Sequence, residues 1–308
     1  MRPVIELAGV EKSFKRTAVL RGATLSVPEG CVVGLLGTNG AGKSTLIKCL
    51  LGLLRTDAGS ARVLGEDAWN LSPEVKQQLG YVPQEAQFYA WMKVRQIVAY
   101  WGTFYRHWDR AWVELLLDRW ELPRDRRVGP LSPGQQQRLA LVLALGHRPR
   151  LLVLDEPMAA LDPIGRRETL GSLVDLQNEG DRTTLFSTHI LSDLERVATH
   201  IAILAEGRIA CFDELDALKD RVKRLRVVSE SDLPLSFSVP GSLRTERSGR
   251  QALVAVANLD DALLRSLRET WRADVLVEDL NLEEIFIELS GRGRSRTADL
   301  AAQSTLGE

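Results

Sequence analysis

The sequence predicts an α/β protein with a mostly parallel core sheet, because short apolar runs alternate with amphipathic segments over the first 220 residues. Three runs have the length and composition of buried strands, namely residues 31–36, 150–154 and 183–187. The first lies between Gly30 and Gly37 and is followed by apolar residues at helical spacing over residues 43–54. Since each run leads into a helical pattern, we expect parallel strands joined by crossover helices.

Length, charge and cysteine content narrow the class of protein. The 308 residues correspond to about two domains of roughly 150 residues each, and 44% of them are hydrophobic. With 40 Lys and Arg against 41 Asp and Glu, the net charge of −1 argues against a disordered chain and against a protein that coats nucleic acid. The longest apolar run, residues 139–146, is far shorter than the ~20 residues that cross a bilayer. Three widely spaced cysteines favour neither a disulfide framework nor a zinc site, so we expect a soluble protein of a reducing compartment.

Changes in composition indicate the organisation of the chain. Residues 84–148 are largely helical in pattern and include a long aromatic stretch, so we expect a helical insert, with a break near residues 107–109. Short strand patterns and two helical patterns over residues 221–290 predict a small α+β domain after a boundary near residue 220. From residue 291 the chain is rich in Gly, Arg, Ser and Ala without periodicity, so residues 291–308 are expected to be a disordered tail.

A phosphate-binding loop is predicted where the first strand meets the first helix. The stretch matches G-x-x-x-x-G-K-[ST] and consists of Gly37, Thr38, Asn39, Gly40, Ala41, Gly42, Lys43, Ser44 and Thr45. Its glycines let successive N–H groups point into one concavity, and the N-terminus of the following helix adds about +0.5 of an elementary charge. Lys43 is expected to reach the β- and γ-phosphates, and Ser44 to ligate Mg²⁺. The motif predicts a P-loop NTPase.

A pair of carboxylates follows the second buried strand. Asp155 and Glu156 come at its carboxyl end, where open α/β sheets bind ligands. Asp155 is expected to hold Mg²⁺ through water, and Glu156 to act beside the γ-phosphate as a general base or to orient the attacking water. Two carboxylates that cap a helix are the structural alternative, and the P-loop in the same chain favours the catalytic interpretation.

A third motif, Leu131-Ser132-Pro133-Gly134-Gln135, is similar to an LSGGQ-type signature. Together with the P-loop and the carboxylate pair, in this order, it makes residues 4–218 resemble the ATP-binding subunits of ABC transporters. The resemblance implies an ABC ATPase domain over residues 1–220, with an antiparallel β-subdomain beside the core sheet and the helical insert at residues 84–148. It also implies ATP and Mg²⁺ as cofactors, ATP hydrolysis as the activity, Asp155 as the Walker B carboxylate and Glu156 as the catalytic one.

The resemblance assigns roles to four further residues. Phe14 stands where the family has an aromatic that stacks on adenine, and Gln84 matches the Q-loop glutamine, which serves the metal and the catalytic centre. Asp162 matches the D-loop, and His189 matches the switch histidine. Taken alone, Phe14 would be a core aromatic, Gln84 a solvated side chain and His189 a packed or exposed histidine. Their order and spacing relative to the P-loop favour the functional interpretation.

The signature implies a head-to-tail dimer around two ATP molecules, because in the family it contacts the γ-phosphate bound to the opposite subunit. Ser132, Gly134 and Gln135 match the residues that do so. Pro133 replaces a glycine of the signature; we expect Ser132 to cap the following helix and Pro133 to take its first position, where an N–H has no helical partner. Ala159 replaces the usual serine of the D-loop. Both half-sites are complete, which favours a homodimer over a pairing with a different ATPase.

The resemblance also implies integral membrane subunits as partners, because no segment of the chain could span a bilayer. In the family such a subunit docks near the Q-loop, and here Phe88, Tyr89 and Trp91 follow Gln84 and are expected to contact it. Other aromatic residues, spaced three or four apart, are expected in the core of the insert: Trp101, Phe104, Tyr105, Trp108 and Trp112. Residues 187–195 and 282–291 are similar to ATPases of bacterial drug and antibiotic exporters of the ABC-2 type. We therefore expect an exporter ATPase at the cytoplasmic face of the cell membrane.

Three alternatives remain open at this point. An importer ATPase is one, although sugar importers tend to have a longer, all-β C-terminal domain. A soluble ABC protein that acts on ribosomes or DNA would carry two ATPase sets or a long coiled coil, and we expect no nucleic-acid partner. A non-catalytic module that uses ATP only to dimerise is disfavoured by Lys43, Glu156 and His189. The transported substrate is set by the membrane subunits and not by any pattern in this chain.

Overall fold

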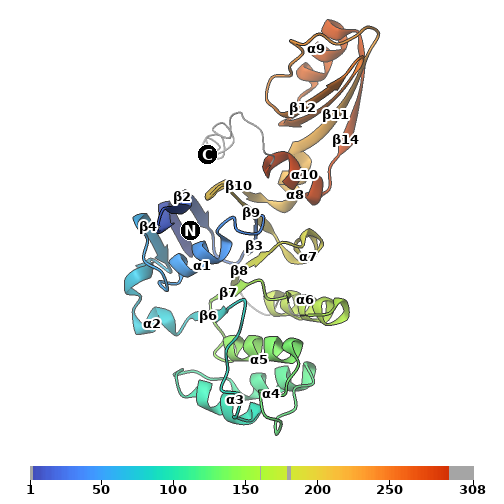
Figure 1. Cartoon of the computed structure of the whole chain (residues 1–308). Helices are drawn as coiled ribbons and strands as arrows, with labels where there is room; N and C mark the ends of the chain where they lie inside the picture. Colours follow the sequence, from blue (N-terminus) through green and yellow to red (C-terminus); the bar gives the residue numbers. More distant parts are fainter. Residues whose placement is uncertain (1–2, 160, 179–181, 291–308) are drawn as a thin grey trace. The chain divides into compact units, whose positions relative to one another are not determined.

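The computed structural model describes residues 3–159, 161–178 and 182–290, and the chain divides into two compact units, Met1–Ile209 and Ala210–Glu308. Figure 1 shows the helices and strands of each unit. Residues 291–308, predicted to be a disordered tail, lie outside the described residues. Within the described ranges, no helix is long and apolar enough to cross a membrane.

A six-stranded sheet includes the parallel strands of the first unit, and its edge strand at residues 208–214 runs across the boundary after Ile209. Its strands are, in spatial order, β10 (Arg208–Glu214), β9 (His200–Ala205), β3 (Val32–Leu36), β8 (Thr183–Thr188), β7 (Leu151–Asp155) and β6 (Leu79–Val82). β3, β7 and β8 are buried along their whole length, as expected for strands covered on both faces. β3 pairs in parallel with β8 and β9, and β7 pairs in parallel with β6 and β8. The predicted mostly parallel core sheet is confirmed.

A second, antiparallel sheet lies in the N-terminal part of this unit. Its strands are, in spatial order, β2 (Thr17–Val27), β1 (Ile5–Phe14), β4 (Ala58–Val63) and β5 (Glu66–Asp67). β1 and β2 form a hairpin in which Phe14 is opposite Thr17, so Phe14 lies at the hairpin end. The short helices η1 (Ala68–Asn70) and α2 (Pro73–Lys76) lead from this sheet to β6. The antiparallel β-subdomain implied by the resemblance is therefore present.

Crossover helices connect the parallel strands (Figure 1). They are α1 (Lys43–Leu50) after β3, α6 (Pro163–Asn178) after β7 and α7 (Leu191–Val197) after β8. Leu194 of α7 is fully buried, and a Cβ at Gly34 of β3 would overlap its side chain. Glycine at position 34 thus permits α7 to pack closely against the sheet.

The helical insert lies between β6 and β7 and contains α3 (Val94–Gly102), α4 (Arg110–Arg119) and α5 (Pro133–Leu145). The predicted helix break is present and covers residues 103–109. Trp108 fills this break: a Cβ at Gly102 would lie 3.0 Å from its ring, and one at Gly146 would overlap it. Asp109 then caps α4 by accepting a hydrogen bond from the Trp112 amide (2.9 Å). Phe104 is 56% exposed, so its predicted place in the core of the insert is wrong.

A four-stranded antiparallel sheet organises the second unit. In spatial order it contains β12 (Ser242–Ser248), β13 (Gln251–Ala257), β11 (Val222–Ser229) and β14 (Ala273–Asp279). The helices of this unit are α8 (Leu215–Arg221), α9 (Asp261–Trp271) and α10 (Leu282–Ser290). Leu267 of α9 packs with Leu233 and Phe237 into the apolar core under the sheet. The sequence pattern does not predict β12, because its side chains are partly or fully exposed and mostly polar.

A buried histidine joins the insert to the core sheet. The His147 side chain is 6% exposed, its Nε2 lies 3.0 Å from the Leu79 carbonyl oxygen of β6, and its ring stacks on Tyr105 at 3.8 Å. Its Nδ1 is buried without a hydrogen-bond partner among the described residues. Burial lowers the pKa of His147 to about 4, and the nearby Arg182 charge contributes to the shift.

The depressed pKa of His147 predicts a loss of stability in acid. Between the unfolded pKa of about 6.5 and the folded pKa of about 4, the unfolded chain binds a proton that the folded chain does not, so stability falls as pH falls. This one group should lower the free energy of unfolding by about 2 kcal/mol between about pH 7.5 and about pH 5. Urea unfolding of the wild type and of His147→Gln at both pH values isolates the effect. The variant should show a smaller decrease, and an equal decrease in both proteins would contradict the assignment.

Candidate nucleotide-binding site

The P-loop turns tightly between β3 and the start of α1. Gly42 has a φ of 105°, a left-handed conformation that favours glycine, and a Cβ at Gly37 would lie 2.7 Å from the Leu204 carbonyl oxygen. α1 begins at Lys43, and Gly42 offers no side chain to cap its first turn. The first N–H groups of α1 and the partial positive charge of its N-terminus therefore face the loop, which suits a phosphate group.

Lys43 is the buried cation of this loop. Its Nζ donates to the carbonyl oxygens of Gly37 (2.9 Å) and Thr38 (3.3 Å) and lies 3.5 Å from Oε1 of Glu156. The side chains of Lys43 and Glu156 are 5% and 13% exposed. Because burial penalises a charge that has no partner, this ion pair and the two carbonyl contacts compensate the burial of both side chains.

Asp155, at the end of β7, is 1% exposed and joins three elements. Its Oδ1 accepts hydrogen bonds from Oγ of Ser44 in α1 (3.1 Å) and from Oγ of Ser187 in β8 (2.8 Å). Ser187 also accepts a hydrogen bond from the Glu156 amide (2.9 Å). Sequence reasoning assigned no role to Ser187. The signal that could have found it is a hydroxyl at the end of a buried strand, close before His189.

Glu156 connects Lys43 to His189. Its Oε2 lies 3.2 Å from Nδ1 of His189, while its Oε1 faces Lys43. Glu156 has a φ of 47°, a left-handed conformation that is uncommon outside glycine and costs of order 1–3 kcal/mol. The His189 side chain is 46% exposed, so the imidazole lies on the solvent side of this chain of contacts.

Ser44 and Asp155 fit a magnesium ion that is completed by phosphate and water. Hydroxyl and carboxylate oxygens are the hard donors that Mg²⁺ prefers, and Ser44 Oγ and Asp155 Oδ1 are 3.1 Å apart. In the described ranges, no group of three or more His, Cys, Asp or Glu could hold a metal by itself. The pKa of the neighbouring Tyr81 is raised to about 12, mainly because burial disfavours its charged form and also because of the negative charge of Asp155. Gln84 is exposed and, within the described chain, forms no hydrogen bond with Ser44 or Asp155.

The residues expected to contact adenine and the opposite ATP lie apart from this cluster. Phe14 is 44% exposed, with Lys12 Nζ 5.8 Å from its ring centroid. Ser132 and Gln135 form a capping box at the start of α5, in which each side chain accepts the other's amide at 3.2 Å. Pro133 takes the first position of α5, so the predicted cap is confirmed. Among the described residues, no hydrogen bond or ion pair joins residues 132–135 to the P-loop.

The D-loop residue Asp162 lies directly before α6. Its Oδ1 accepts a hydrogen bond from the Gly165 amide (2.6 Å), which caps the first turn of that helix. Ala160, which follows Ala159 in the predicted D-loop, is outside the described residues. In the described part of the chain, Asp162 forms no hydrogen bond or ion pair with Lys43 or Glu156.

The predicted docking aromatics form part of an exposed ring cluster. Tyr89 and Trp91 are 52% and 67% exposed, and Phe88 is partly buried. The Tyr89 ring centroid lies 6.1 Å from that of Trp91 and 6.2 Å from that of Tyr100. Phe104 continues the cluster at 5.0 Å from Tyr100, so it packs on another exposed ring and not in the core of the insert.

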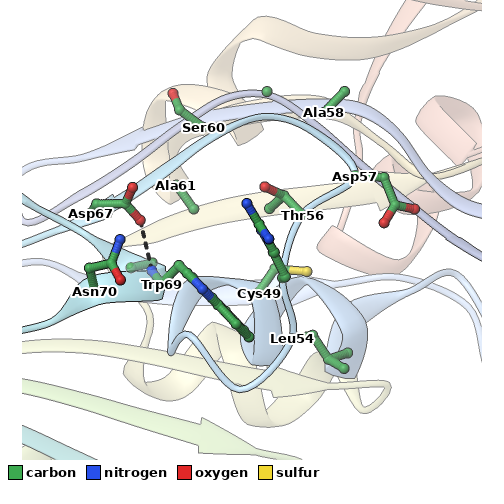
Figure 2. A pocket seen from close by; sticks show the side chains of 13 residues that line it. Cys49, Leu54, Thr56, Asp57, Ala58, Ser60, Ala61, Asp67, Trp69 and Asn70 are labelled. Carbon is green, nitrogen blue, oxygen red and sulfur yellow. Dashed lines mark hydrogen bonds between the residues drawn. The ribbon is translucent and has the colours of Figure 1, made fainter.

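A pocket of about 280 Å³ lies near the C-terminal end of α1 and contains none of the predicted site residues (Figure 2). Asp57 at its rim pairs with Lys12 (2.7 Å), and the Asp67 carboxylate accepts the Trp69 amide (2.8 Å). The pocket is formed by Cys49, residues 54–61 and residues 67–70. It is therefore separate from the P-loop cluster.

Comparison with known proteins identifies the family of this arrangement. The family model described as ABC transporter matches residues 20–159. The chain is 30% identical to "ABC transporter ATP-binding protein YtrB" of Bacillus subtilis (strain 168), over 94% of this chain and 99% of that protein. It is 34% identical to "Nod factor export ATP-binding protein I" of Bradyrhizobium diazoefficiens, over 94% of this chain and 96% of that protein.

A solved structure shares the fold. "Structure of ATP binding subunit of ABC transporter" superposes with a TM-score of 0.64 at 27% identity, over 70% of this chain and 92% of that chain. The near-complete coverage of the relatives, the shared fold and the P-loop, Asp155 and Glu156 cluster agree with one another. The chain belongs to the family of ABC transporter ATP-binding proteins and is an ATPase of that family.

Proposed function

We propose that this chain is the ATP-hydrolysing subunit of an ABC exporter, in which two copies bind two ATP·Mg²⁺ head to tail and drive a substrate through separate membrane subunits. The observation that carries the proposal is the buried cluster in which Asp155 binds Ser44 and Glu156 contacts both Lys43 and His189. This cluster places a cation, two carboxylates and an imidazole beside a loop suited to phosphate.

Each residue of the cluster has a distinct task in the proposal. Lys43 neutralises the β- and γ-phosphates, and the bound Mg²⁺, held by Ser44, Asp155 and Gln84, would withdraw charge from the same phosphates. Glu156 accepts a proton from the attacking water or orients this water. His189 contacts the Glu156 carboxylate and keeps it correctly placed relative to the γ-phosphate. The remaining loop residues bind phosphate through their backbone: Gly37, Thr38, Asn39, Gly40, Ala41, Gly42 and Thr45.

The second half of each site comes from the other subunit. Ser132, Gly134 and Gln135 would contact the γ-phosphate of the opposite chain, with Asp162 at the same interface, and Phe14 would stack on adenine. The exposure of Phe14 supports this division, as does a start of α5 that forms no hydrogen bond or ion pair with the P-loop among the described residues. Closure of the dimer then excludes water and completes both sites, and hydrolysis removes the phosphate that bridges them.

We further propose that the chain drives export and that it does so together with membrane subunits. A relative at 34% identity is named an export ATP-binding protein, and it matches this chain over nearly its whole length, including the region of residues 221–290. The exposed rings of Tyr89 and Trp91, close after Gln84 in the chain, are of the residue types that contribute most to binding hot spots. We place the membrane subunit on this surface, which would hold the chain at the cytoplasmic side of the membrane.

Lys43→Ala should weaken ATP binding by at least about tenfold, because it removes the cation beside the phosphates. The variant also leaves the Glu156 carboxylate without its buried partner. Titration of a fluorescent ATP analogue measures the dissociation constant. Lys48→Ala is the matched control, since Lys48 lies on the same helix α1 and is exposed. Equal affinities for the two variants would contradict the role of Lys43.

Glu156→Gln should lower kcat for ATP hydrolysis by about 10²-fold or more and leave ATP binding intact, because the amide keeps the shape and loses the proton acceptor. A phosphate-release assay on the wild type and the variant measures kcat. A variant with wild-type turnover would remove Glu156 from the mechanism.

Gly134→Asp should abolish ATP-dependent dimerisation while single-chain ATP binding stays intact. An aspartate in the first turn of α5 is compatible with the helix, yet it places a negative charge where the opposite γ-phosphate is expected. Light scattering with Mg-ATP in the Glu156→Gln background reports the dimer. Normal dimerisation of Gly134→Asp would contradict the head-to-tail arrangement.

A further inference from the structure

A charged contact links the signature helix α5 to the D-loop helix α6. Arg138 lies in the second turn of α5, and its Nη2 is 3.0 Å from Oε2 of Glu168 on α6. The Arg138 side chain is 18% exposed, whereas that of Glu168 is 58% exposed. The buried Nε of Arg138 has no hydrogen-bond partner among the described residues. Arg138 is thus held against α6 by one ion pair and by close packing.

Gly165 makes room for this packing. A Cβ at Gly165 would lie 2.9 Å from Nη2 of Arg138 and 3.2 Å from Oδ1 of Asp162. The guanidinium and the Asp162 carboxylate therefore approach the same point beside the backbone of the first α6 turn. The Asp162 oxygen also accepts the Gly165 amide, so Asp162, Gly165 and Arg138 form one connected group.

We propose that Arg138 is a positioning residue that couples the signature segment to Asp162. The inference rests on the proposed function, in which Ser132 engages the ATP of the opposite subunit and Asp162 lies at the same interface. When Ser132 meets a γ-phosphate, the resulting shift of α5 is passed through Arg138 to the first turn of α6 and to Asp162. Each chain thereby relays the occupancy of one ATP site toward the other, through packed side chains and not through the nucleotide.

The simpler interpretation is that the ion pair between Arg138 and Glu168 has no effect on the rate of ATP hydrolysis. A pair with one well-exposed partner contributes little to stability, and its loss alone would not change kcat. The two interpretations separate at Arg138, because its substitution leaves Gly165 and Asp162 in place, whereas a Cβ at Gly165 would crowd both the Arg138 guanidinium and the Asp162 carboxylate. A structural role predicts wild-type hydrolysis in an Arg138 variant, whereas the positioning role predicts slower hydrolysis with single-chain ATP affinity unchanged.

The experiment compares four variants of the full chain with the wild type. Gly165→Ala displaces the guanidinium, Arg138→Met removes its charge, and Arg138→Lys keeps a cation within reach of Glu168. Gly171→Ala is the matched control, because Gly171 lies on the same helix and a Cβ there would meet nothing within 4 Å. The readouts are the thermal midpoint, the affinity of the single chain for a fluorescent ATP analogue, kcat, and the Hill coefficient for ATP.

We expect Gly165→Ala and Arg138→Met to lower kcat about tenfold and to bring the Hill coefficient toward one, with single-chain ATP affinity unchanged, because displacement of a positioning contact impairs geometry and not binding. Arg138→Lys should recover part of the loss. Gly171→Ala should raise the thermal midpoint, because it adds helix propensity and its Cβ meets nothing, and it should hydrolyse ATP as the wild type does.

Wild-type kcat and Hill coefficient in Gly165→Ala and Arg138→Met would overturn the coupling while leaving the proposed function intact. A parallel loss of kcat in Gly171→Ala would also overturn it, because stiffening of α6 would then be the cause. A wild-type chain that neither hydrolyses ATP nor dimerises with it would instead overturn the proposed function itself, and the coupling with it.

Discussion

The buried carboxylate of Asp155 is the contact on which the rest of the site depends. It receives hydrogen bonds from Ser44 at the start of α1 and from Ser187 at the end of β8. β3, β7 and β8 are neighbouring parallel strands, so the segments that leave their carboxyl ends meet at one edge of the sheet. The Asp155 carboxylate, which is 1% exposed, thus connects its own strand β7 to helix α1 of the P-loop and to strand β8, which leads to His189.

Charge burial explains the order of the groups around Asp155. Lys43 lies between two carbonyl oxygens and Glu156, and Glu156 lies between Lys43 and His189. The contacts of Lys43 lie in a low-dielectric surrounding, where they are stronger than in water and where an unpaired Lys43 or Glu156 would be costly. In the proposed mechanism the same arrangement would present a cation and backbone amides to phosphate and a carboxylate to water, so the contacts that compensate the buried charges would also serve the chemistry.

The residues proposed to complete the site lie outside this cluster, on other elements. Ser132 caps α5 in the helical insert, Asp162 precedes α6, and Phe14 lies at the end of the first hairpin. The contact between Arg138 and Glu168 joins α5, the helix that Ser132 caps, to α6, the helix that follows Asp162, and it does not involve the P-loop. In the proposed function, the cluster around Asp155 is the phosphate-binding half of the site, and these other elements would supply the second half to the ATP of another molecule.

Local patterns determined what the sequence by itself could determine about this protein. The P-loop, the Asp155-Glu156 pair and the Ser132-Pro133 cap each depend on residues that are close together in the chain, so spacing and residue type were sufficient. Strand β12, the exposure of Phe104 and the two hydrogen bonds of Ser187 depend on neighbours that are distant in sequence. Only the tertiary structure decided these features, because a side chain becomes buried, paired or exposed through the elements that pack against it, and no local pattern records which elements those are.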